Sequence, residues 1–315
     1  MPHLSSTWRS TAAALAIAAL PLATQAAAQQ AADGGPPGYN AACNCYRAVP
    51  YGSLSWFEPT TKKLAHQVMD IWMPSAGTGP RPIVYYGHPN GTSQFIAYDT
   101  RPGSLWGRLV KPLTDQGFIV VSYEFRHPVV NYVPGKPAPR YDIQKAINAF
   151  VANYAAVLGA DPGNSFVSGQ SRGGGLGILT ALTGTLGGGT QVRALWTYQA
   201  QTTFSCEESA RDFVLASDRD TFLAACTAVP NAGSAMRAVT AAAPPTVVAY
   251  DRAFHRELVP ASEVDVHYPD FGWQLCRHYA DQGDGAACQA VESLPEASAW
   301  AGMADYFTAH RQAPL

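Results

Sequence analysis

A glycine-flanked serine is the feature of this sequence that most directly suggests chemistry. Residues 168–175 read Ser-Gly-Gln-Ser-Arg-Gly-Gly-Gly, which places Ser171 in a Gly-x-Ser-x-Gly pattern. A predicted strand (165–168) precedes it, and an apolar, helix-like stretch (176–179) follows. In so tight a strand-to-helix turn only glycine fits two positions on either side, and the serine hydroxyl is exposed at the sheet's carboxyl edge. The pattern predicts a nucleophilic serine whose oxyanion develops near the positive end of the following helix.

Such a serine also needs a carboxylate and a histidine, in the chain order Ser, Asp or Glu, His. Asp251 comes directly after an apolar run at 246–250 and is the preferred acid. Glu257 is the alternative, because it opens an acid-x-Val-Pro pattern. Either carboxylate could instead be an ordinary charge of a solvated loop.

The histidine is chosen by the direction of the chain. Four histidines follow Ser171: His255, His267, His278 and His310. His278 lies eleven residues beyond His267 in a predicted helix that runs away from the sheet's carboxyl edge, where Ser171 lies. At 1.5 Å per residue this places His278 about 16 Å further from that edge. His310 ends another predicted helix at the opposite edge. His267 is therefore the preferred general base and His255 the alternative, although a histidine at a helix start is also common as part of a local turn.

Short apolar runs without alternation supply the elements that must position these residues. Such runs are typical of strands buried on both faces of a parallel sheet. Helical spacing recurs between them, which predicts an α/β fold with a mostly parallel twisted sheet flanked by helices. Ala-rich material at 203–240 interrupts the alternation and predicts a small helical insertion that could act as a cap. The predicted strands are 68–74, 82–86, 118–123, 165–168, 192–198 and 246–250.

Together these motifs resemble the carboxylesterase and lipase group of the α/β-hydrolase fold, including its feruloyl-esterase-like serine hydrolases. The resemblance covers roughly residues 66–310 and rests mostly on residues 169–174. In that group a His-Gly-Gly loop supplies backbone N–H groups to the oxyanion. Here the corresponding residues 87–92 read Gly-His-Pro-Asn-Gly-Thr, and Pro89 has no N–H to donate. The resemblance then implies an oxyanion hole formed by Asn90 or Gly91 together with Arg172, the residue after the nucleophile.

The sequence departs from that group at the histidine. The group carries it between the last strand, expected here near 286–294, and the last helix, expected near 297–310. The intervening Pro295-Glu296 contains none. The resemblance implies an exported serine hydrolase that cleaves carboxylic esters, with a small-molecule ester as its partner and no metal or organic cofactor. The alternative is a non-catalytic, hydrolase-like ligand-binding protein, which the missing histidine favours.

Composition excludes other classes of protein. The 315 residues carry 21 Lys and Arg against 23 Asp and Glu, for a formal net charge of −2. No basic stripe is visible, so a nucleic-acid partner is not expected. After the N-terminal region no segment reaches eighteen consecutive apolar residues, so stable membrane association is not expected either.

The N-terminal region predicts export. An apolar run at 11–22 follows Arg9, and small residues follow the run, which is the layout of a signal peptide over residues 1–28. An uncleaved anchor is the alternative. Residues 29–42 are rich in Ala, Gly and Pro and predict a flexible leader, so the hydrolase domain is expected at 43–315. The protein is expected to be periplasmic or secreted.

The cysteines agree with an oxidising compartment. Six cysteines lie after the predicted signal peptide, enough for three disulfides. The expected local pairs are Cys206–Cys226 and Cys276–Cys288, which leave Cys43 and Cys45 near the start. A zinc site at Cys43-Asn44-Cys45 is not expected, because neither a C-x-x-C motif nor clustered histidines accompany it.

Overall fold

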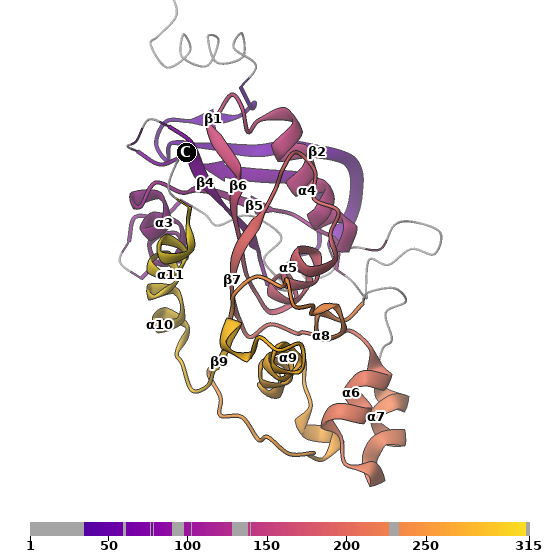
Figure 1. Ribbon diagram of the computed structural model, residues 1–315. Helices are drawn as coiled ribbons and strands as arrows, with labels where there is room; N and C mark the ends of the chain where they lie inside the picture. Colours follow the sequence, from indigo (N-terminus) through magenta and orange to yellow (C-terminus); the bar gives the residue numbers. More distant parts are fainter. Residues whose placement is uncertain are drawn as a thin grey trace, which may run out of the picture.

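A single nine-stranded sheet organises the part of the chain that the structure describes. The computed structural model describes residues 35–312 except 59–60, 76, 78, 90–97, 102, 128–137, 139 and 227–232. The strand order is β1-β2-β3-β5-β4-β6-β7-β8-β9 (Figure 1). The strands are β1 Tyr39–Asn40, β2 Cys45–Glu58, β3 Lys63–Trp72, β4 Arg81–Gly87, β5 Ile119–Tyr123, β6 Ala160–Gln170, β7 Val192–Tyr198, β8 Thr246–Ala249 and β9 Cys288–Val291.

The direction of the strands confirms the predicted fold class. The strands β5, β4, β6, β7, β8 and β9 pair in parallel, whereas β1, β2 and β3 add an antiparallel edge beside β5. Because parallel strands end at one edge of a sheet, the turns after β4, β5, β6 and β8 meet there.

Helices cover both faces of the sheet. Successive residues of β4 point to opposite faces of the sheet, so a separate core forms on each face (Figure 1). Ile83 and Tyr85 pack on the face that α4, α5 and α9 cover. Val84 and Tyr86 pack on the face that η1, α3, α10 and α11 cover. The helices are α3 Lys111–Asp115, α4 Arg140–Asn153, α5 Ser171–Thr183, α6 Cys206–Phe213, α7 Arg219–Ala225, α8 Ala235–Ala238, α9 Asp270–Asp281, α10 Glu296–Ala301 and α11 Met303–His310. Short turns are η1 Trp106–Val110, η2 Ala216–Asp218, η3 Ala261–Glu263 and η4 Gly285–Ala287. Every described helix is too short or too polar to span a bilayer.

Buried ion pairs and disulfides fix the connections around the sheet. Arg126, just after β5, pairs with Asp142 of α4 at 2.8 Å, and both side chains are buried. The structure contains the two predicted disulfides, Cys206–Cys226 and Cys276–Cys288, and it joins Cys43 to Cys45. The first ties α6 to the end of α7, and the second ties α9 to β9.

The ends of the chain differ from the sequence-based prediction. Strand β2 was not predicted, and β1 lies inside the segment predicted to be a flexible leader. Strand β9 is shorter than the predicted 286–294. The predicted last helix is two helices, because α10 ends at Ala301 and α11 begins at Met303, with Gly302 between them. The predicted signal peptide lies outside the described residues.

Candidate active site

The turn between β6 and α5 has the shape that the glycine pattern predicts. β6 ends at Gln170 and α5 begins at Ser171, whose φ of 52° lies in the left-handed region that non-glycine residues rarely adopt. A Cβ added at Gly173 would lie 2.4 Å from the carbonyl oxygen of Gly87, at the end of β4. One added at Gly169 would lie 2.8 Å from the same oxygen. The glycines therefore let the turn pack against β4 while holding Ser171 at the sheet's edge.

His267 lies directly beside this serine. The distance between Ser171 Oγ and His267 Nε2 is 2.7 Å, a hydrogen bond. His267 is half-buried and sits in the loop between β8 and α9. Burial lowers the pKa of His267 below its ordinary value of 6.5, because desolvation disfavours the imidazolium. Asp265 and Asp251 act in the opposite direction, and Arg252 adds to the lowering. The ring can therefore accept a proton from the serine at neutral pH.

The main chain of His267 is held by Asp265 and Arg252. The Asp265 carboxylate accepts a hydrogen bond from the backbone N–H of His267 at 2.7 Å and pairs with Arg252 at 3.0 Å. Arg252 in turn donates to the backbone carbonyl of His267 at 2.6 Å. Burial alone would raise the pKa of Asp265, but these hydrogen bonds hold it below its ordinary value. Sequence reasoning missed Asp265, although a carboxylate two residues before the candidate base was a visible signal.

The two candidate acids take different positions. Asp251 is exposed and lies close enough that its negative charge raises the pKa of His267. Among the described residues the His267 ring bonds to Ser171 and makes no hydrogen bond to a carboxylate. Glu257 is also exposed, and it does not contribute to the pKa of His267. Of the two carboxylates, Asp251 is the one whose charge changes the pKa of His267.

His255, the alternative base, faces elsewhere. Its ring stacks on Tyr268 with centroids 5.2 Å apart, and its Nε2 lies 3.8 Å from the Glu263 carboxylate. Its backbone N–H donates to Asp270 at 2.9 Å. The structure therefore does not bring His255 to Ser171.

Arg172 is the one predicted oxyanion donor that can be placed. Asn90 and Gly91 lie outside the described residues, whereas Arg172 is the second residue of α5. Its side chain is buried, with the guanidinium 5.1 Å from the centre of the Phe125 ring. Burial lowers the pKa of Arg172 to about 10, although the negative charges of Glu58 and Glu124 oppose that change. Its backbone N–H starts the helix, where positive potential is greatest.

A buried pair that sequence reasoning missed supports the start of the 87–92 loop. His88 Nδ1 donates to the carbonyl of Pro89 at 2.9 Å, and His88 Nε2 lies 3.3 Å from the Glu124 carboxylate. His88 and Glu124 are 3% and 1% exposed, so the contact is shielded from water. Burial raises the pKa of Glu124, while His88 and Arg172 act against the rise. The available signal was an acidic residue directly after a buried strand.

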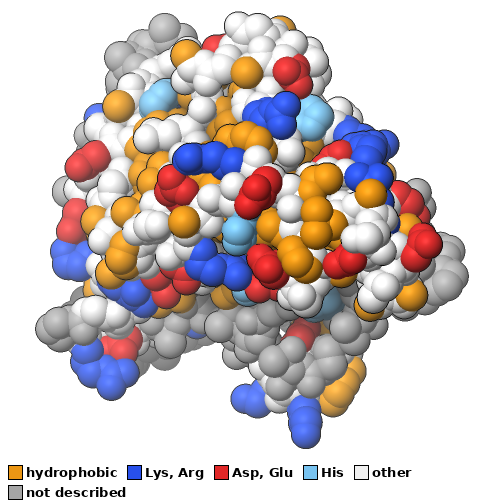
Figure 2. Space-filling view, turned by 90° about the horizontal axis from the view of Figure 1, so that it is seen from below, with side chains coloured by type: hydrophobic (Ala, Val, Ile, Leu, Met, Phe, Trp, Pro, Cys, Tyr) orange, Lys and Arg blue, Asp and Glu red, His pale blue; other side chains and the backbone are white. Residues whose placement is uncertain are grey.

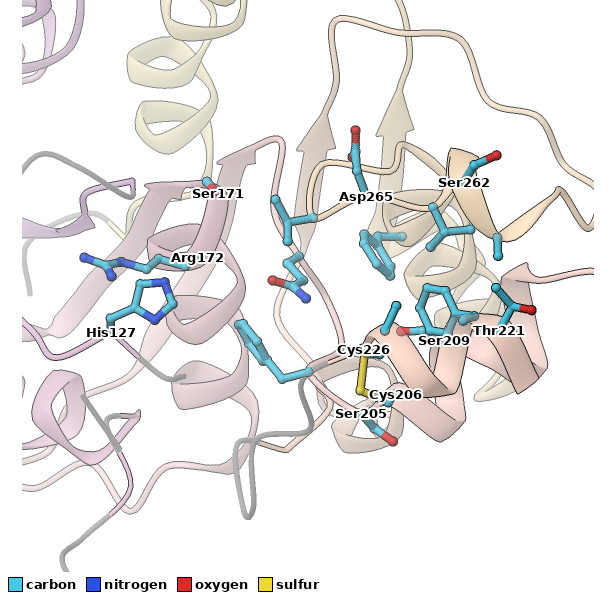
Figure 3. A pocket seen from close by; sticks show the side chains of 18 residues that line it. His127, Ser171, Arg172, Ser205, Cys206, Ser209, Thr221, Cys226, Ser262 and Asp265 are labelled. Carbon is cyan, nitrogen blue, oxygen red and sulfur yellow. A yellow bond between two sulfur atoms is a disulfide. The ribbon is translucent and has the colours of Figure 1, made fainter. Parts of the chain in front are cut away.

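A pocket of about 690 Å³ opens beside the serine (Figure 3). Its wall includes Ser171, Arg172 and His127 at one end and the disulfide Cys206–Cys226 at the other. Burial and the charge of Arg172 lower the pKa of His127 to about 4, with Glu58 opposing. In the described parts of the chain, His, Cys, Asp and Glu side chains form no group of three that could hold a metal ion.

Comparisons with known proteins agree with this architecture. Residues 69–210 match the family model BD-FAE, while no curated protein sequence matches the chain. A truncated form of a carbohydrate esterase from gut microbiota aligns over 88% of this chain and 99% of its own, at 19% identity and a TM-score of 0.54. A bacterial heroin esterase aligns over 95% of each chain, at 20% identity and a TM-score of 0.52. The chain has the α/β-hydrolase fold.

A fungal esterase has the same fold, but the histidine beside Ser171 comes from an unexpected loop in this chain. Carboxyl esterase 2 from the mycorrhizal fungus Tuber melanosporum aligns over 83% of this chain and 86% of its own, at 18% identity and a TM-score of 0.52. In this chain the short link between β9 and α10 carries no histidine. The histidine that reaches Ser171 is His267, which lies in the loop between β8 and α9. This loop comes before β9 in the chain, whereas the expected position comes after β9.

Proposed function

We propose that this protein is an exported serine hydrolase that cleaves carboxylic esters. The observation that carries the proposal is the 2.7 Å contact between Ser171 Oγ, in a left-handed turn at the end of β6, and His267 Nε2. The neighbours with the same fold are a carbohydrate esterase, a heroin esterase and a carboxyl esterase, which supports an ester as the substrate. In this proposal Ser171 is the nucleophile, His267 the general base and Asp251 the acid.

The geometry supports a two-step acyl transfer. Ser171 Oγ attacks the ester carbonyl carbon while its proton passes to His267 Nε2. The tetrahedral intermediate then breaks its bond to the alcohol oxygen, which takes that proton from His267 and leaves. A water molecule, deprotonated by His267, attacks the acyl–Ser171 ester, and the same histidine returns the proton to Ser171 as the carboxylic acid departs. No redox partner is needed. The proton of Ser171 leaves with the alcohol and is replaced by a proton from water, so Ser171 and His267 end in the forms in which they began.

The oxyanion of each intermediate is assigned to backbone N–H groups. The Arg172 N–H at the start of α5 is one donor, and Asn90 or Gly91 supplies the other. The thirteen-residue α5 directs its positive end toward this point. The His88–Glu124 pair would hold His88 and the adjoining Pro89 carbonyl in place directly after β4.

Export is part of the same proposal. The cysteines in all three pairs of the described chain are oxidised, which suits a periplasmic or secreted protein. The predicted signal peptide at residues 1–28 would direct that export.

Covalent labelling tests the proposal directly. The purified protein is treated with a fluorophosphonate, digested, and the adduct located by mass spectrometry. We expect one adduct per molecule on the peptide that contains Ser171, because His267 removes the hydroxyl proton during attack. Ser171→Ala should abolish the label. A folded protein that stays unlabelled would overturn the proposal and favour non-catalytic ligand binding.

The pH dependence of kcat/KM should report His267. The neutral ring is the active form, so activity rises with pH as the imidazolium loses its proton. Because burial holds the pKa of His267 below 6.5, half of the plateau should be reached below pH 6.5. A kcat/KM profile from about pH 4 to about pH 9 measures this midpoint. A midpoint above about pH 7 would contradict His267 as a desolvated general base.

A further inference from the structure

The pocket continues from Ser171 to the helices α6 and α7, which lie at one extremity of the molecule (Figure 1). Figure 3 shows Ser171, Arg172 and His127 at one end and Cys206, Cys226 and Thr221 at the other. Catalysis as proposed needs only the first end. The second end, called here the distal end, is defined by the pocket-lining residues of α6, α7 and the disulfide that joins them: Cys206, Ser209, Thr221, Phe222, Ala225 and Cys226.

Among the described residues that line it, the distal end is largely apolar and carries no ionised side chain. Phe222, Ala225 and the Cys206–Cys226 disulfide supply apolar surface, and the polar groups near them are the neutral hydroxyls of Ser209 and Thr221. A substituent bound there would lose its water without finding a charge to pair with. An apolar group is favoured by such a wall, whereas a carboxylate or ammonium group is disfavoured.

The titratable residues of the pocket lie at its serine end, point away from it, or are paired with another charge. Asp265 is paired with Arg252, and its labelled side chain points away from the pocket in Figure 3. Arg172 lies at the serine end, and the low pKa of His127 leaves that ring neutral at pH 7. Acidic and basic side chains are interspersed with hydrophobic ones on the face shown in Figure 2, so no single charge dominates it.

The distal wall is held in place before any ligand arrives. The disulfide Cys206–Cys226 joins the first residue of α6 to the residue after α7. Ser205 caps α6 by accepting a hydrogen bond from the backbone N–H of Glu208 at 3.2 Å. The Glu208 carboxylate is fully buried and accepts a hydrogen bond from Arg237 at 2.8 Å. A wall fixed in this way sets a size limit rather than adapting to each substrate.

We propose that the distal end binds a bulky apolar group of the ester, and that α6, α7 and their disulfide determine how large that group can be. This inference rests on the proposed ester hydrolysis and names its substrate class. The apolar group belongs either to the acid or to the alcohol, and the substrates chosen below separate these two sources.

Three esters test whether a long apolar group is preferred and on which side of the ester it lies, with ethyl acetate as the reference. Ethyl acetate is small on both sides, ethyl octanoate is long on the acid side, and octyl acetate is long on the alcohol side. We expect kcat/KM of one long ester to exceed that of ethyl acetate by at least about tenfold, since each buried methylene is worth about a fourfold gain. The long ester that gains identifies the side that enters the distal end.

Ala225→Trp places an indole in the distal end and has a matched control on the same helix. Both alanines are exposed, but Ala225 lines the pocket and its neighbour Ala224 does not. We expect Ala225→Trp to lower kcat/KM for the preferred long ester by about 10–100-fold and to leave ethyl acetate within about twofold. Ala224→Trp should leave both unchanged. Ala261→Phe, at the start of η3 and also lining the pocket, repeats the test if Ala225→Trp does not fold.

The outcomes separate this inference from the proposed function. If the protein labels at Ser171 and hydrolyses ethyl acetate but neither long ester is preferred, the function stands and the inference fails. It also fails if Ala224→Trp and Ala225→Trp, both folded by thermal melting, have the same effect. If Ser171 is never labelled and no ester is cleaved, the proposed function fails first.

Discussion

Replacing His267 with alanine should lower kcat for ester hydrolysis by at least about 10⁴-fold, with a much smaller change in KM. The reason is the 2.7 Å contact between its Nε2 and Ser171 Oγ, since without the ring the serine proton has no acceptor. Ethyl acetate or p-nitrophenyl acetate hydrolysis under saturating conditions measures kcat. Circular dichroism and thermal melting establish that the variant is folded.

His255→Ala is the matched control for this loss. The His255 ring stacks on Tyr268 and lies 3.8 Å from Glu263, so removing it should leave kcat within about threefold. The reverse result, with His255→Ala inactive and His267→Ala active, would show that the loop rearranges to present the other histidine. A His267→Ala variant that keeps full fluorophosphonate labelling would likewise remove His267 from the mechanism.

The parallel part of the fold was predictable because its strands are buried on both faces. Runs such as 82–86 and 118–123 contain no charged residue, and the serine in the second, Ser122, is itself buried, so length and composition identify them. Strand β2 was missed for the opposite reason. It contains Pro50 and Gly52, which ordinarily weaken a strand, and its pairing with β3 changes register on either side of Pro50. Its position at the antiparallel edge tolerates both.

The site residues could be predicted only where the direction of the strands determines at which edge of the sheet a residue lies. Ser171 must end a strand, and Asp251 and His267 remain at the same edge because each follows β8 before the next helix begins. The distal end of the pocket had no such constraint. Its residues come from α6 and α7, and only the folded insertion, closed by the Cys206–Cys226 disulfide, brings these two helices to the pocket. The Asp265 contact likewise depends on how the loop before α9 folds back on Arg252.

Replacing Asp251 with asparagine should lower kcat by up to about 10⁴-fold. The negative charge of Asp251 stabilises the imidazolium that forms when Ser171 gives up its proton to His267. Asp251 already raises the pKa of His267. The neutral amide removes that charge, so the acid limb of the kcat/KM profile should also move to lower pH. Steady-state rates and pH profiles measure both effects.

Asp265→Asn is the informative comparison, because Asp265 also raises the pKa of His267. Its carboxylate is occupied by Arg252 and by the backbone N–H of His267, at 3.0 Å and 2.7 Å. It therefore acts as a positioning residue, and its loss should lower kcat by only about tenfold while shifting the acid limb in the same direction. Since both variants shift the pH profile, the fall in kcat separates the two roles. A loss of about 10⁴-fold in Asp265→Asn, with Asp251→Asn still active, would reassign the acid to Asp265.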